Sequence, residues 1–178
     1  MSASLAHSSA AAVVTLADLD RREVVVLVAG YGARLVELEP HETIPGSYWG
    51  ESEAGLIGDA VYVRADTPAH SLLHELCHFV CMDDARRAAL ATDAGGSDDE
   101  ESAVCYLQVL LAQTLSGFGA ERCLADMDAW GYSFREGSAR AWFDGDGKHA
   151  RAWLVKHGFI DAQQQQQPIR ELRRTSHS

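Results

Sequence analysis

The stretch with the clearest chemical capacity is H-E-L-C-H, from His74 to His78. Residues four apart on an α-helix lie about 40° apart around its axis, so His74 and His78 project side by side. Glu75 then lies on the flank of the same face. Two imidazoles can bind one metal ion in this arrangement, and the carboxylate beside them is placed to act as a base.

The helix that carries this pattern is expected to be buried. Thr67 can cap its start, and Pro68 suits the first helical position. Apolar residues cover more of its surface than a helix with one wet face would show: Leu72, Leu73, Leu76, Phe79 and Val80. Two alternatives to metal binding stay open. The histidines could be satisfied by hydrogen bonds in a core helix, or the pattern could occur by chance.

A catalytic zinc site needs a third protein ligand, and the segment 97–112 offers Glu100 and Glu101. Glu100 shares its helical stripe with Val104, which predicts that it points inward. A buried carboxylate needs a partner, and a metal ion would supply one. Glu100 is therefore the preferred third ligand, and Glu101 is the alternative. Ser97 and Glu100 also match a capping box, which would give Glu100 a structural role instead.

The elements that must position these residues follow from the periodicity of the chain. A helix is predicted over 16–30, with a strand as the alternative for its β-branched part. Alternation predicts a strand over 33–39, and Gly58-Asp59 between two apolar runs predicts a β-hairpin. Further helices are expected over 84–92, 100–115, 120–130 and 147–157. The fold class is therefore α+β, with a small antiparallel or mixed sheet of about three strands packed on the H-E-x-x-H helix.

Composition bounds the kind of protein. The 178 residues, 47% of them hydrophobic, suit one domain over 16–160, with a disordered lead over 1–15 and a disordered glutamine-rich, basic tail over 161–178. A net charge of −11 argues against nucleic acid and anionic membranes as partners. No apolar run is long enough to span a bilayer, and the start of the chain resembles a signal peptide only loosely, so a cytoplasmic location is expected. The four cysteines are expected to be small core residues, with a Cys77–Cys81 metal site as the alternative.

The H-E-x-x-H helix followed by an acidic helix resembles the gluzincin metallopeptidases, and among them the compact ImmA/IrrE-type and minigluzincin families. Their second helix reads E-x-E-A-N-x-F-A-x-x-L-L, and the matching stretch here is E-E-S-A-V-C-Y-L-Q-V-L-L, from Glu100 to Leu111. Ser102 replaces the second glutamate. Val104 replaces the Asn or Asp that supports the site, so that support is missing or comes from elsewhere. The resemblance covers roughly 16–115 and implies a zincin-like fold.

The resemblance implies a soluble zinc metallopeptidase, with Zn²⁺ held by His74, His78 and Glu100. Glu75 would be the general base that takes a proton from a zinc-activated water during hydrolysis of a peptide or protein substrate. A further donor should stabilise the oxyanion, and the candidates are His70, Tyr106, Tyr132 and His149. Tyr48 and Trp49 could line the cleft. The alternative function is a weakly active or inactive zinc-binding domain that regulates through protein interaction. The oligomeric state is not indicated.

Overall fold

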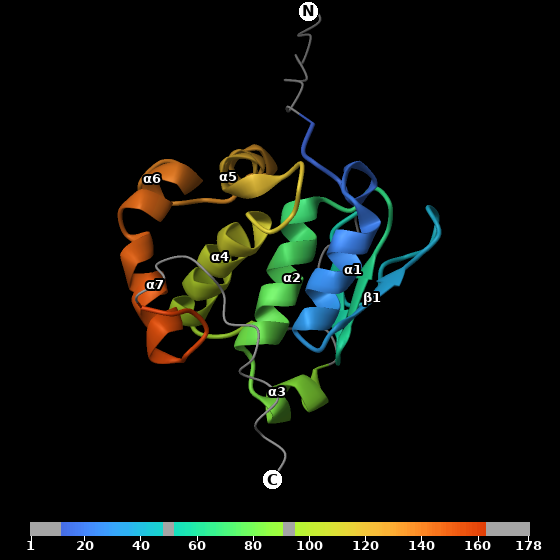
Figure 1. Ribbon diagram of the computed structural model, residues 1–178, viewed down its shortest axis with the longest axis horizontal. Coiled ribbons are helices and arrows are strands. Elements are labelled where there is room, and N and C mark those ends of the chain that lie inside the picture. The colour runs from blue at the N-terminus through green and yellow to red at the C-terminus, as the bar shows by residue number, and fades with distance from the viewer. Residues whose placement is uncertain (1–11, 48–51, 91–94, 163–178) are drawn as a thin grey trace, which may run out of the picture.

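The computed structural model describes residues 12–47, 52–90 and 95–162 (Figure 1). In these ranges the elements are a 3₁₀ helix η1 (Leu16–Asp18), three strands and seven α-helices. The strands are β1 (Arg34–Glu37), β2 (Gly55–Ile57) and β3 (Ala60–Val63). The helices are α1 (Arg21–Gly30), α2 (Ala69–Cys81), α3 (Asp84–Ala89), α4 (Asp98–Ala112), α5 (Gly119–Trp130), α6 (Ala139–Asp144) and α7 (Gly147–Lys156). The predicted α+β class is confirmed.

The three strands form one mixed sheet with the order β1-β3-β2. β2 runs antiparallel to β3 through the predicted turn, where Gly58 has a φ of +58° that suits glycine. β1 runs parallel to β3, with Leu35 opposite Val61. Edge strand β2 lies under a tight loop, because the backbone of 45–47 passes directly over Gly55. The β2 edge also lies against α2, where the Ala54 amide just before the strand donates to the Ser71 hydroxyl at 3.0 Å.

Helix α2 packs against β2 and β3 on one side and against α4 and α5 on the other (Figure 1). All of its residues are buried except His74 and Glu75, which are partly exposed. The predicted buried helix is thus confirmed, and it opens toward the surface only at its motif. Its start differs in detail from the expectation. Pro68 occupies the cap position, while the Thr67 hydroxyl accepts a hydrogen bond from the Arg64 amide at 2.8 Å.

The chain before α1 is tied into the fold earlier than expected. Thr15 forms a β-bridge with Pro68 at the start of α2, and the Leu16 amide donates to the Thr67 carbonyl. The Val14 amide donates to a carboxylate oxygen of Asp126 on α5 at 2.8 Å. The predicted disordered lead over 1–15 was therefore too long, because residues 12–15 are part of the folded domain. Residues 1–11 of that lead and 163–178 of the predicted tail lie outside the described residues.

The C-terminal helices cover the outer side of α4. α6 was not predicted from the sequence. It begins because the Ser138 hydroxyl accepts from the Ala141 amide and the Asp128 carboxylate accepts from the Ala139 amide. The ring of Tyr106 on α4 stacks on Phe143 of α6 with centroids 4.5 Å apart. These aromatic contacts attach the last third of the chain to the helix that carries the glutamates.

Two features of the described chain bear on its chemistry. Its four cysteines, Cys77, Cys81, Cys105 and Cys123, are buried and form no disulfide. Within the three described ranges, no helix combines the length and apolarity that a membrane span requires.

Candidate metal centre

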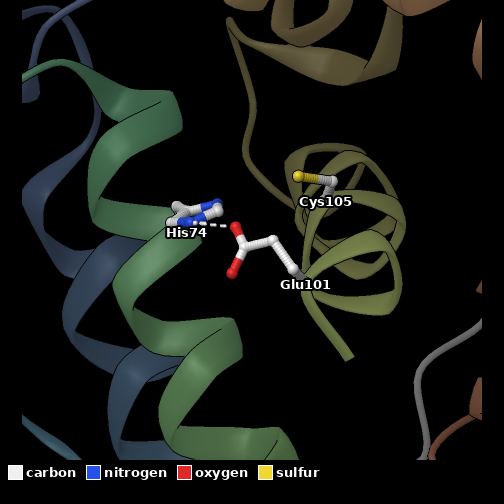
Figure 2. A group of neighbouring side chains, drawn as sticks. All are labelled: His74, Glu101 and Cys105. Atoms are coloured by element: carbon white, nitrogen blue, oxygen red, sulfur yellow. Dashed lines mark ion pairs between the residues drawn. The ribbon is translucent and has the colours of Figure 1, made fainter. Parts of the chain in front are cut away.

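Three side chains from two helices converge on one point. Nε2 of His74 lies 3.1 Å from Nε2 of His78, as their spacing on α2 predicted. The carboxylate of Glu101 on α4 reaches both imidazoles, with Oε1 3.1 Å from His74 Nε2 and Oε2 3.3 Å from His78 Nε2. Figure 2 shows Glu101 and His74 pointing toward each other across the gap between the helices. The predicted pairing of an α2 motif with an α4 glutamate is therefore present.

The separations suit a tetrahedral zinc ion. Ligand atoms about 2.0–2.1 Å from zinc lie about 3.3 Å from one another at tetrahedral angles. The two imidazole nitrogens, 3.1 Å apart, are close to that edge length, and each lies 3.1–3.3 Å from a different oxygen of the Glu101 carboxylate. Two imidazole nitrogens and a carboxylate oxygen are also a donor set found at catalytic zinc. Cys105 extends the cluster, because its Sγ and ligand atoms of His74 and Glu101 all lie within 4.8 Å of one another.

The structure corrects the choice between the two glutamates. Glu100 is buried, as its apolar stripe predicted, but both of its oxygens bind the Arg86 guanidinium at 2.8 and 2.9 Å. Arg86 supplies the positive charge that was expected from a metal. The Ser97 hydroxyl accepts from the Glu100 amide at 3.3 Å, so that half of the expected capping box is present. Glu101, one helical step of about 100° further round, faces the histidines instead.

Gln108 supplies the support that the sequence left unassigned at Val104. Its Oε1 lies 2.6 Å from Nδ1 of His74. An amide oxygen can only accept, so Nδ1 carries a hydrogen, and Nε2 is the nitrogen that faces Glu101 and would bind a metal after losing its own proton. Glu101, Cys105 and Gln108 follow the i, i+4, i+7 spacing of one helical face. That shared polar stripe was the sequence signal that could have identified them together.

The electrostatics of the cluster favour positive charge. Burial disfavours the charged form of His74, but Tyr132, Cys105 and Glu101 outweigh it and hold the pKa of His74 well above its usual value. The hydrogen bond from His74, partly offset by burial, keeps the pKa of Glu101 low. The charges around the cluster would therefore stabilise a cation bound between α2 and α4.

Glu75 lies beside this cluster with a different electrostatic balance. Burial raises the pKa of Glu75 to about 7, with His74 lowering it and Glu101 and Glu53 raising it further. No hydrogen bond to the Glu75 carboxylate occurs among the residues described. A carboxylate with this pKa can take up and release a proton near neutral pH, as general-base chemistry requires.

Of the other predicted residues, Tyr132 is the one with a ring contact to His74 among the described residues. Its ring is edge-on to that of His74 with centroids 6.0 Å apart, and it lines the cavity described below. Burial foremost raises the pKa of Tyr132 to about 12, so the hydroxyl keeps its proton. Nδ1 of His70, fully buried behind it, lies 3.4 Å from the Tyr132 hydroxyl.

Neither of the remaining described candidates, Tyr106 and His149, belongs to the metal cluster. Tyr106 packs between Phe143 and Trp142 and serves the core. His149 is exposed on α7 and lines the cavity. Tyr48 and Trp49, predicted to line the cleft, lie outside the described residues.

A cavity of about 970 Å³ opens onto the cluster. His74, Glu101 and Cys105 line it together with the loop from α5 to α6 and the outer face of α7. The aromatic part of its wall consists of Trp130, Tyr132, Phe134, Trp142 and Trp153. On one side Trp130 donates to the Glu53 carboxylate at 3.0 Å, which joins the end of α5 to the chain before β2. Of these aromatic residues, the sequence predicted only Tyr132 as a candidate for the site.

Comparisons of the chain with protein-family models, curated proteins and solved structures found no match. The interpretation of the site accordingly depends on its own residues and their geometry.

Proposed function

We propose that this protein is a zinc-dependent peptidase of the gluzincin type, with His74, His78 and Glu101 as the metal ligands. The observation that carries the proposal is the convergence of these three side chains from facing helices, with polar atoms 3.1–3.3 Å from one another. A mixed sheet, the H-E-x-x-H helix α2 and the glutamate helix α4 are also the parts that a zincin-like fold requires. The ligand set differs from the one predicted by sequence only in its glutamate.

The residues of this chain have distinct parts in the proposed hydrolysis. A bound zinc ion would supply Lewis acidity, polarising the substrate carbonyl and acidifying a water molecule. Gln108 holds His74 in the tautomer whose Nε2 can bind the metal. Glu75 takes the proton of the attacking water and passes it to the leaving amine, which its pKa of about 7 allows.

Tyr132 is the donor best placed to stabilise the oxyanion. Its protonated hydroxyl belongs to a side chain on the cavity wall beside His74. A donor aimed at developing negative charge is worth most in a site from which water is largely excluded. Buried His70 behind it, 3.4 Å from the hydroxyl, helps to set its direction.

A binding domain without catalysis is the second candidate function. It would explain the metal cluster equally well, because the three ligands alone can hold an ion. Glu75 favours the peptidase, since a binding domain needs no carboxylate with a pKa near neutrality beside the metal.

The test combines metal analysis with peptide turnover. Protein purified without added zinc should contain one zinc per chain, and it should cleave members of a peptide library. Glu75→Gln keeps the size of the side chain and removes the base, so turnover should fall by roughly 10²-fold or more with zinc content unchanged. Turnover that survives in Glu75→Gln would exclude this mechanism. Zinc retention without turnover in either protein would favour the binding domain, and absence of zinc would contradict both.

A further inference from the structure

Cys105 differs from the other thiols of the chain in what it faces. It lies one helical turn after Glu101 on the same face of α4, and Figure 2 shows its sulfur turned toward the gap that His74 and Glu101 share. It lines the cavity, although only 8% of its surface is exposed. By contrast, Cys123 packs its sulfur against that of Met127 at 4.0 Å. Cys105 is thus the cysteine that belongs to the metal cluster.

Cys105 lies beside two of the three proposed ligands. A thiolate about 2.3 Å from zinc lies about 3.6 Å from nitrogen or oxygen ligands at tetrahedral angles. The Sγ atom already lies within 4.8 Å of a ligand atom of His74 and one of Glu101. Rotation of the Cys105 side chain is the movement that would bring Sγ to bonding distance of a metal held by the other three side chains. Thiolate is also among the ligands that zinc binds most strongly.

We propose that Cys105 is a fourth ligand, so that the resting protein holds its metal in a closed site of two histidines, one glutamate and one cysteine. The inference rests on the proposed function, which supplies the other three ligands. When Cys105 binds, its S–H bond breaks, a sulfur–metal bond forms and the proton passes to solvent. A catalytic zinc site needs an open position, whereas four protein ligands make a closed one. Turnover therefore requires that the Cys105 thiolate leave the metal, and the enzyme is latent until it does.

The test uses cobalt(II) as a spectroscopic substitute for zinc in the full-length protein. A thiolate bound to cobalt(II) gives an intense near-ultraviolet charge-transfer band, which nitrogen and oxygen ligands do not give. The metal-free protein is loaded without oxygen, and one cobalt per chain is verified by elemental analysis. The band should be present in the wild type and lost in Cys105→Ser, which should still bind cobalt through its other three ligands. Cys105→Ala serves as a second variant if the serine protein does not fold.

Cys81 provides the matched control. It lies three residues after His78 on α2 and is buried to the same degree, with 7% of its surface exposed. Cys81→Ser should keep the band. A band absent from cobalt-loaded wild type, or one that survives in Cys105→Ser and disappears in Cys81→Ser, would overturn the assignment of Cys105.

Measuring peptide cleavage distinguishes failure of the Cys105 proposal from failure of the proposed peptidase function. Zinc-loaded Cys105→Ser should cleave peptides faster than the wild type, because its fourth position is open. Slower cleavage with full zinc content would refute latency. If the band is absent but Glu75→Gln still abolishes wild-type turnover, the peptidase proposal stands and Cys105 alone is excluded. If the protein binds neither cobalt nor zinc, both proposals fall.

Discussion

Adjacent glutamates at the start of α4 have different partners because one helical step of about 100° separates them. Glu101 meets His74 and His78, while Glu100 is held by both arms of Arg86. The same step decides which carboxylate is available to a metal. Glu100 is neutralised by a fixed guanidinium, and Glu101, with 46% of its side chain exposed, depends on imidazoles that a metal can engage.

The two glutamates should therefore respond differently to the same substitution. Glu101→Gln should weaken zinc retention strongly, because it removes the anionic ligand. Glu100→Gln should retain zinc but lower the free energy of unfolding by about 1.5–3 kcal/mol, the usual worth of hydrogen bonds to a charged group. Elemental analysis after dialysis and urea denaturation measure the two effects. If Glu100→Gln loses zinc and Glu101→Gln keeps it, the third ligand is Glu100 and the assignment of Glu101 is wrong.

At the scale of residues, the sequence predicted that two histidines and a glutamate would come together, but it did not predict which glutamate. His74, His78 and Glu75 follow from the periodicity of one helix, and the structure places them as that periodicity required. The choice between Glu100 and Glu101 depended on Arg86, which comes from α3, 14 residues upstream. Burial of Glu100 was inferred correctly, but helical periodicity contains no information about the partner that a buried charge will find.

At the scale of elements, strand β2 is constrained by a contact with a distant loop that the sequence did not predict. The hairpin around Gly58 was predictable because a two-residue turn has its own composition. The backbone of 45–47 lying on Gly55 was not, since that contact joins two segments with no local signal. Helix α6 was missed for a similar reason. Its short length leaves no periodicity, and one of its caps comes from Asp128 on another helix.

We expect Gly55→Ala to lower the free energy of unfolding by about 1–3 kcal/mol, the range for overpacking a tight site. A methyl group there would overlap the Pro45 carbonyl oxygen, so the loop must move. Gly30→Ala is the matched control, because no atom outside its own helix lies within 4 Å of a methyl group at that position. That change, in helix α1, should be neutral or slightly stabilising. Equal stabilities for both variants in urea denaturation would contradict the crowding at Gly55.

At the scale of the whole molecule, the fully buried His70 couples stability to pH. Burial foremost, and the charge of His74 next, lower the pKa of His70 from 6.5 to about 3. Between these values the unfolded chain binds a proton that the folded protein does not, so stability must fall as the pH is lowered through this window. From pH 7 to pH 5 the contribution is a loss of about 2 kcal/mol.

Replacement of His70 by phenylalanine isolates this contribution. His70→Phe keeps a ring against Tyr132 and removes the titrating group. Urea denaturation in a chelator, which excludes metal binding, should show that the wild type loses about 2 kcal/mol more than the variant between pH 7 and pH 5. Parallel pH profiles for the two proteins would show that His70 takes up its proton as readily in the folded protein as in the unfolded chain, against a lowered pKa.

The hydrogen bond from the Val14 amide to Asp126 joins residues 112 positions apart and is buried. Its consequence concerns the order in which the protein is made. A ribosome synthesises Val14 and the histidine helix long before it reaches Glu101, Asp126 and Tyr132. Until then the nascent chain has two imidazoles without their carboxylate, and the apolar faces of α2 have no α4 or α5 to cover them. The cluster of His74, His78 and Glu101 can therefore assemble only after synthesis of α4, and the N-terminal segment reaches its final place only after α5 has emerged.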